Sequence, residues 1–344
     1  MRSLLYLLSL LFLTAFTGSS KLRAMDAADY LSRISEKQQV ITTESMGYIS
    51  AVAHGKSARK VEKQRTELIN AVLQARATAK NLQPFEGDTA LKSAAYNYFN
   101  LTYIIFKEDY AKIMDMEEIA EQSYDNMEAY LTAQDLANEK LEEAEGKVQQ
   151  EFKAFAARHK VNLIEEETSL DKMADKVNKT NKYYHDVFLV FFKSYHTELY
   201  LLKAIGKKDV NGLEQNKNSL IKSTEEDLGK LSKMTAFDGD GSLLSACKAL
   251  LQFYQNEAKN KMQLATDYFV KEANFAKTKK VIDGGTRNQS DIDAYNKAVD
   301  EVNKAVNVYN KASKELDEGR HKAIMDWNNA TEAFLSKHTP TYNK

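Results

Sequence analysis

Apolar residues recur every three or four positions along most of this chain, the spacing of one face of an α-helix. The longest run starts at Ile292 and ends at Phe334, and we call its thirteen positions the C-terminal seam. Only Ser313 and Arg320 are not apolar among Ile292, Tyr295, Val299, Val302, Val306, Tyr309, Ser313, Leu316, Arg320, Ala323, Trp327, Ala330 and Phe334. This spacing predicts a helix about 65 Å long in a bundle or coiled coil.

The first half of the chain shows the same spacing in shorter runs. The first run extends from Leu31 to Val52, and only Gln38 and Ser45 interrupt its apolar positions. Gly55 then ends the predicted helix, as a glycine after the last helical turn commonly does. Asp88 follows a turn at 84–87 and is a candidate N-cap for the next helix. The pattern predicts four helices: up to Gly55, over about 57–80, from Asp88 to about Tyr110, and over about 115–160. The joint between the last two is either a turn or a kink.

The second half repeats this plan. Its first three helices are expected over about 169–206, 210–234 and 242–282, and the C-terminal seam forms the fourth. Residues 161–168 join the halves, either as a linker or as the middle of one continuous helix.

An internal repeat underlies this symmetry. Six of ten residues in Phe85–Ala94 are identical in Phe237–Ala246, 152 positions later. Near the ends of the halves, Phe155 and His159 match Phe334 and His338 at an offset of 179, so the second copy holds about 27 extra residues. We therefore predict an all-α protein of two tandem, elongated four-helix bundles that arose by internal duplication, with repeat 1 at 25–160 and repeat 2 at 169–338.

The first twenty residues have the layout of a secretory signal peptide. Arg2 precedes an uncharged run, Leu4–Phe16, and small residues follow at 17–20. Thirteen helical residues span about 20 Å, which is short of the bilayer core. We predict cleavage after Ser20, with Ala24 as the alternative. The run ends without a cysteine for a lipid anchor, so we expect a secreted, periplasmic or cell-surface protein that is not a lipoprotein.

Composition narrows the picture further. The chain has only 2 Pro and 13 Gly, which favours long helices with few turns. Its 48 basic and 49 acidic residues are interspersed, with no basic surplus of the kind that nucleic-acid binding requires. Cys247 is the only cysteine, so no internal disulfide can form. We expect a small buried hydrophobe there, with an intermolecular disulfide as the minor alternative.

Motifs for catalysis or metal binding are incomplete. A di-iron bundle needs Glu-x-x-His on two helices, but the only match is Glu318–His321. Asp238–Ser242 looks like the start of a calcium loop, yet Leu243 and Ala249 occupy its sixth and twelfth places. We interpret these as an exposed helix face and a helix-initiating turn. The chain is therefore predicted to be non-enzymatic, without a metal or cofactor.

One aromatic helix offers a candidate ligand pocket. The six side chains considered for it are Tyr184, His185, Phe188, Phe192, Tyr195 and His196. The two histidines are eleven residues apart, about 16 Å along a helix, so they cannot share a metal ion. A stripe of aromatic residues at helical spacing is more often core than pocket, which is the competing interpretation.

Residues 114–131, continuing to Leu141, resemble uncharacterised all-helical surface proteins exported by bacteria. The resemblance implies export and brings no catalytic residues. We therefore expect a secreted or envelope protein that presents surfaces to a protein partner. A carrier of a small apolar or aromatic ligand, held between helices of the second bundle, is the alternative. A helical pore-forming toxin is a third class.

Overall fold

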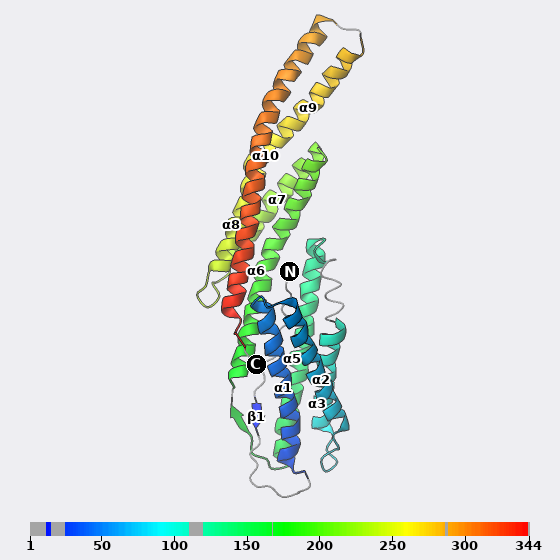
Figure 1. The fold of residues 1–344 in the computed structure, drawn as a ribbon, viewed down its shortest axis with the longest axis vertical. Coiled ribbons are helices and arrows are strands. Elements are labelled where there is room, and N and C mark those ends of the chain that lie inside the picture. Colours follow the sequence, from blue (N-terminus) through cyan, green and yellow to red (C-terminus); the bar gives the residue numbers. More distant parts are fainter. Residues whose placement is uncertain (1–11, 15–24, 110–119, 167, 286–287, 343–344) are drawn as a thin grey trace. The chain divides into compact units, whose positions relative to one another are not determined.

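The computed structural model describes residues 12–14, 25–109, 120–166, 168–285 and 288–342 (Figure 1). Over these residues the protein is all-α, with long helices packed in bundles and two three-residue strands, so the predicted fold class is confirmed. In the first half the elements are β1 (Phe12–Thr14), α1 (Ala27–Ala53), α2 (Ala58–Asn81), α3 (Ala90–Ile104), the π-helix η1 (Ile105–Asp109), α5 (Tyr124–Arg158) and β2 (Ile164–Glu166). In the second half they are α6 (Ser169–Gly206), α7 (Val210–Leu231), α8 (Ser242–Asn256), the π-helix η2 (Glu257–Lys261), α9 (Met262–Asp283) and α10 (Gln289–His338).

The chain divides into two compact units. Unit 1 comprises residues 1–185 and 333–344, and unit 2 comprises residues 186–332. Because α6 and α10 each contribute to both units, this division differs from the predicted repeat boundaries, 25–160 and 169–338, which follow sequence similarity. The repeats are segments of sequence, whereas unit 1 also includes the first part of α6 and the last residues of α10, which belong to repeat 2.

The predicted duplication is visible in the turns that precede α3 and α8. Phe85 forms an isolated bridge with Asp88, and Phe237 forms the same bridge with Asp240, 152 residues later. The two residues inside each turn have positive φ angles: 50° and 86° at Glu86 and Gly87, and 48° and 80° at Asp238 and Gly239. In both copies, glycine thus occupies the position with the larger positive φ, which disfavours a side chain.

The same offset relates the helices that follow. α3 and α8 begin and end 152 residues apart, and so do the π-helices η1 and η2. A π-helix is rare and interrupts the normal helical repeat. Its recurrence at one offset therefore ties the two halves together more strongly than the modest sequence identity does.

The role predicted for Asp88 is wrong by one position. The N-cap of α3 is Thr89, and Asp88 Oδ1 accepts a hydrogen bond of 3.0 Å from the Ala90 amide. In the second copy Gly241 is the N-cap, and Asp240 accepts from Ser242 in the same way. The turn ends one residue before the N-cap, so the aspartate carboxylate lies outside the helix and accepts a hydrogen bond from the amide of the first helical residue.

Two joints also differ from expectation. The helix predicted over 115–160 begins at Tyr124, after a turn at 121–122, with Ser123 Oγ accepting from the Asn126 amide at 3.1 Å. Residues 110–119 lie outside the described residues. The alternative of one helix running through 161–168 is wrong, because α5 stops at the His159 C-cap and Lys160 has a φ of 56°.

The strands lie beside this second joint. β2 pairs antiparallel with β1. β1 is the only described part of the predicted signal peptide 1–20, because residues 1–11 and 15–24 lie outside the described residues. Both predicted cleavage sites lie there too, so cleavage stays a prediction.

Aromatic rings from α1, from α5 and from the turn before α3 pack against one another in unit 1. Tyr30 of α1 stacks on Phe155 of α5 with ring centroids 5.1 Å apart, and Phe85 meets Phe155 edge-on at 5.5 Å. Next to them, Arg158 binds Asp88 at 2.5 Å. Burial alone would raise the pKa of Asp88, but its bonds to the Ala90 amide and Arg158 lower it below its ordinary value. The turn before α3 is thereby fastened to the end of α5.

The residues after α10 pack onto α1 within unit 1. His54, the C-cap of α1, lies 3.2 Å from both Ser336 Oγ and Thr341 Oγ1 through its two ring nitrogens. The Tyr342 amide donates to Ser50 Oγ at 3.0 Å. As expected, His54, His159 and His338 all lie at helix ends.

The C-terminal seam has the predicted phase on α10. Leu316, Trp327 and Phe334 are buried, and the Trp327 ring stacks on Phe191 of α6 at 4.7 Å. Burial decreases toward the start of the helix, where Ile292 is 38% exposed. The seam is therefore continuous in sequence but is covered along only part of its length.

Trp327→Ala should lower the free energy of unfolding by about 3–5 kcal/mol, because it removes a large buried ring that has a stacked partner. Urea unfolding followed by circular dichroism measures this. The control is Met325→Ala on the same helix, which removes a side chain that is 47% exposed and should change stability by less than about 0.5 kcal/mol. Equal effects of the two substitutions would show that the seam is assigned to the wrong face.

Candidate functional site

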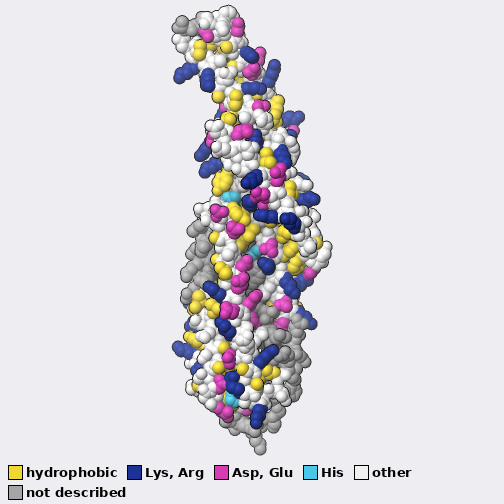
Figure 2. Space-filling model, turned by 180° about the vertical axis from the view of Figure 1, so that it is seen from behind, with side chains coloured by type: hydrophobic (Ala, Val, Ile, Leu, Met, Phe, Trp, Pro, Cys, Tyr) yellow, Lys and Arg dark blue, Asp and Glu magenta, His cyan; other side chains and the backbone are white. Residues whose placement is uncertain are grey.

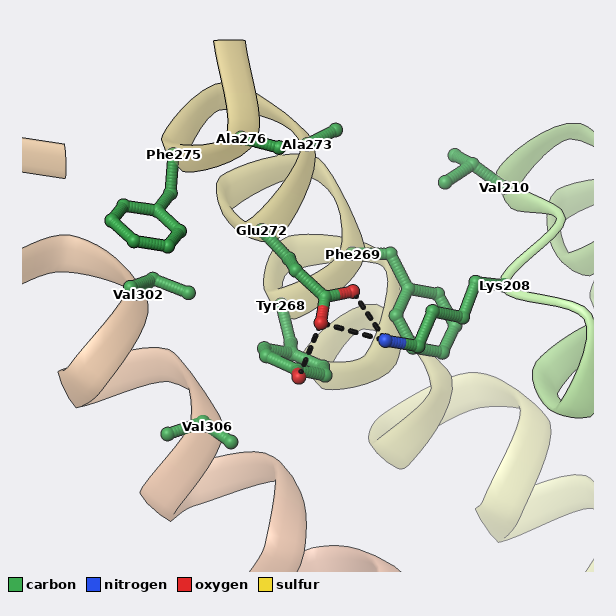
Figure 3. Close-up of a pocket in the computed structure, with 10 residues that line it drawn as sticks. All are labelled: Lys208, Val210, Tyr268, Phe269, Glu272, Ala273, Phe275, Ala276, Val302 and Val306. Carbon is green, nitrogen blue, oxygen red and sulfur yellow. Dashed lines mark hydrogen bonds and ion pairs between the residues drawn. The ribbon is translucent and has the colours of Figure 1, made fainter. Parts of the chain in front are cut away.

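A groove opens between α9 and α10 in unit 2, and we call it the hairpin groove (Figure 3). Its volume is about 600 Å³. α9 and α10 run side by side there and continue past the loop that joins α6 to α7 (Figure 1). The groove is mainly apolar, and its walls are Lys208, Val210, Tyr268, Phe269, Glu272, Ala273, Phe275, Ala276, Val302 and Val306.

A cluster of three polar side chains, Lys208, Tyr268 and Glu272, interrupts the apolar lining of the hairpin groove. Lys208 Nζ lies 2.6 and 2.7 Å from the two Glu272 oxygens, and the Tyr268 hydroxyl donates to Glu272 Oε1 at 2.9 Å (Figure 3). The bond to Glu272 raises the pKa of Lys208, and the same bond lowers the pKa of Glu272. Both groups are partly solvated, so the pair orients the Lys208 side chain more than it stabilises the fold.

Aromatic contacts hold the two helices of the groove together. Tyr268 stacks on Tyr309 at 4.9 Å, and Phe275 meets Tyr295 at 5.8 Å. Elsewhere on these two helices, outside the lining of the groove, Val270, Val281 and Val308 are exposed by 53%, 49% and 51%.

The six side chains considered for a ligand pocket lie along α6. Five of them are buried, and Tyr195 is partly exposed. Phe188 stacks on Phe192 at 5.3 Å, and the His196 ring lies 4.7 Å from Phe192. These contacts are those of packed aromatic residues, and a ligand at Tyr184, His185, Phe188, Phe192, Tyr195 and His196 stays a prediction.

Unit 2 also contains a buried ion cluster, formed by Arg320, Glu198 and Glu257. The Arg320 guanidinium, only 13% exposed, binds Glu198 through Nε and Glu257 through a terminal nitrogen, and both carboxylates are buried. A further nitrogen donates to exposed Asp317 at 2.7 Å. Arg320 is one of the two polar positions of the C-terminal seam, and this break in the apolar pattern was the signal that could have predicted a buried charge.

The cluster holds one guanidinium against two carboxylates. Burial raises the pKa of Glu198 and raises that of Glu257 to about 7, although Arg320 opposes both shifts. Burial alone would lower the pKa of Arg320, but the two carboxylates raise it, so Arg320 stays charged. Because Glu257 begins the π-helix η2, the cluster joins this irregular turn to α6 and α10.

The structure also places the residues of the remaining sequence motifs. Glu318 and His321 are exposed, as predicted. Cys247 is fully buried, and burial raises the pKa of its thiol, which agrees with the expected small buried hydrophobe. No group of three or more potential metal ligands occurs among the residues that the structure describes. Basic and acidic side chains are interspersed over the face shown in Figure 2.

Comparisons with known proteins give no family. The sequence matches no family model and no curated protein, and no solved structure matches the fold. The resemblance of residues 114–141 to exported bacterial surface proteins therefore stays a prediction. None of the helices in the described part of the chain has the length and apolar character of a membrane span.

Glu257→Gln should make stability less dependent on pH. The pKa of Glu257 rises from 4.5 to about 7 on folding, so the folded state binds the proton more tightly. The resulting stabilisation is complete below pH 4.5 and is lost as pH rises through 7. Urea midpoints between pH 5 and 8 should fall less steeply in Glu257→Gln than in the original protein.

The control for this prediction is Glu318→Gln, which changes an exposed carboxylate on α10 and should keep the original slope. Identical slopes in all three proteins would mean that Glu257 titrates near its ordinary value.

Proposed function

We propose that this is an exported, non-enzymatic helical protein that binds a protein partner through the hairpin groove. The observation that carries the proposal is that the C-terminal seam extends past the helices that cover it. At Leu316 and Trp327 the seam is at most 8% exposed, whereas Ile292 is 38% exposed. An amphipathic helix laid along α9 and α10 would bury this remaining stretch, as in other helix-in-groove complexes.

The charges of the two helices that form the groove define the partner further. Between Val270 and Asp283, α9 carries four lysines and two acidic residues; between Gln289 and Val308, α10 carries two lysines and four acidic residues. A partner helix with an apolar stripe, an acidic edge toward α9 and a basic edge toward α10 would complement the charges of both helices.

The other two function classes have less support. The aromatic residues proposed for a ligand carrier contact one another along α6, so nothing beyond their composition favours a ligand there. A pore-forming toxin is the third class, and no observation on the described residues favours it over partner binding.

A photo-crosslinker tests the partner interaction in the native host. Benzoylphenylalanine replacing Val306, which lines the hairpin groove, should crosslink to one protein that mass spectrometry can identify. The same replacement at Val308, which is 51% exposed and lies outside the groove, is the matched control and should give little of this product. Equal crosslinking at both positions, or at neither, would refute the groove as the binding face.

The predicted signal peptide gives a second test. Protein recovered from the envelope or the medium should begin at Lys21, or at Met25 if the alternative cleavage occurs, because the segment before it is removed on export. Intact-mass measurement of the recovered chain decides between these ends. A chain that keeps residues 1–20 and stays in the cytoplasm would contradict export.

A further inference from the structure

A second groove, in unit 1, is independent of the proposed partner site, and we call it the acidic groove. It lies between α5 and α6 and has a volume of about 390 Å³. Glu142, Glu145 and Gln149 line it from α5, and Asp175, Asn178 and Lys179 line it from α6. Three carboxylates against one ammonium give these walls a net negative charge.

The register of the two helices explains this composition. His185 Nδ1 of α6 lies 3.8 Å from Asp135 of α5, and the short connection between the helices makes them antiparallel. Counting from this contact places Asp175 opposite Glu145, and Asn178 opposite Glu142. Acidic and amide side chains thus face one another along the same two turns.

Glu145 lies on the buried stripe of α5, between Leu141 and Val148. It is only 3% exposed, and its Oε1 atom has no hydrogen-bond partner among the residues that the structure describes. A buried carboxylate oxygen without a donor is costly and calls for an explanation. The Asn178 Oδ1 atom in the same groove is also buried and without a partner. Asn178 Oδ1 is a hydrogen-bond acceptor, and both oxygens of Glu145 are acceptors once its carboxyl is ionised, so an occupant that brings donors and a positive charge would satisfy these atoms.

We propose that the acidic groove binds a small aliphatic di- or polyamine, with Glu145, Asp175 and Asn178 accepting hydrogen bonds from an ammonium group. An ammonium supplies three donors and a positive charge, which answers both the unsatisfied oxygens and the excess of carboxylates. A second ammonium lies within reach of Glu142 at the exposed side of the groove. A metal ion fits less well, because no group of three potential ligands is close enough among the described residues.

Gly146 makes this occupant possible. It lies on α5 in the wall of the groove, and a Cβ added there would meet no atom within 4 Å. The open space is therefore real volume beside Glu145. Leucine at this position would fill part of the groove and would also favour the helix, because glycine disfavours a helix interior by about 1 kcal/mol.

Binding should also release a proton. Burial raises the pKa of Glu145 well above its ordinary value, and Glu142, Asp171 and Asp175 add to the shift. The other groups near Glu145 are the Tyr98 hydroxyl of α3 and Lys179 at the groove wall. A bound ammonium favours the ionised carboxylate, so Glu145 loses its proton when the amine enters.

Isothermal titration calorimetry of the full chain with putrescine and with spermidine tests the proposal. We expect one saturable site, with a heat that varies with the ionisation enthalpy of the buffer because a proton is released. Glu145→Gln should weaken binding at least tenfold and abolish the buffer dependence. Glu139→Gln, an exposed carboxylate on the same helix outside the groove, should leave both unchanged.

Gly146→Leu provides a variant that should block binding without lowering the melting temperature. The proposal is overturned if neither amine binds, if Glu145→Gln binds as tightly as the original protein, or if uncharged 1,4-butanediol binds equally well. Mg²⁺ binding more tightly than putrescine would also overturn it, because the site would then be a metal site. Each of these results leaves the crosslinking test of the hairpin groove unaffected.

Discussion

Each long helix in this protein carries one apolar stripe, and burial of that stripe against neighbouring helices is what holds the bundles together. The chain has no disulfide, and its many surface ion pairs contribute little. Where neighbouring helices are present, as at Trp327 and Phe334, the side chains of the stripe are buried. Where they end, as along the first half of α10, the same stripe leaves apolar surface exposed. The packed core and the hairpin groove are therefore two outcomes of one constraint.

The two units differ in how the polar residues on these stripes are paired. In unit 2, Arg320 is matched by Glu198 and Glu257, so its charge is compensated within the fold. In unit 1, Glu145 occupies a comparable position with one oxygen unsatisfied. The buried carboxylates of unit 2 therefore have a cation beside them, although Glu198 and Glu257 each keep one oxygen without a hydrogen-bond partner among the described residues. Glu145 has no such pairing with a cation in the described part of the chain, and this difference is what the amine proposed for the acidic groove would remove.

Much of the fold followed from periodicity. The bounds predicted for α6, and the start of α8 at Ser242, agree with the structure, because glycine-containing turns and the 152-residue repeat mark them in the sequence. The π-helices η1 and η2 were not predicted, since a single extra residue in a helical turn barely disturbs an apolar pattern. The end of α5 at Arg158 lies within two residues of the prediction, but the alternative of a continuous helix stayed open because a left-handed lysine, Lys160, takes the place that glycine would normally mark.

The grooves were harder to predict than the helices. Gln38, Ser45 and Arg320 were visible as polar interruptions of apolar stripes, and all three have little or no exposure in the fold. The partners of Arg320 were not predictable, because Glu198 and Glu257 lie on helices far away in sequence. The hairpin groove depends on where α6 and α7 stop relative to α9 and α10. Hydrophobic spacing gives the face of a helix but not the length of its neighbours.

The residues that follow α10 have a consequence for how the chain can be divided. Thr341 and Tyr342 bind the end of α1, and unit 1 also includes the first half of α6. A fragment that stops at Lys160 contains the whole of repeat 1 yet lacks both of these segments. Unit 2, by contrast, lies wholly within repeat 2. Repeat 1 therefore cannot complete unit 1 without residues from the second half of the chain, whereas unit 2 takes nothing from repeat 1.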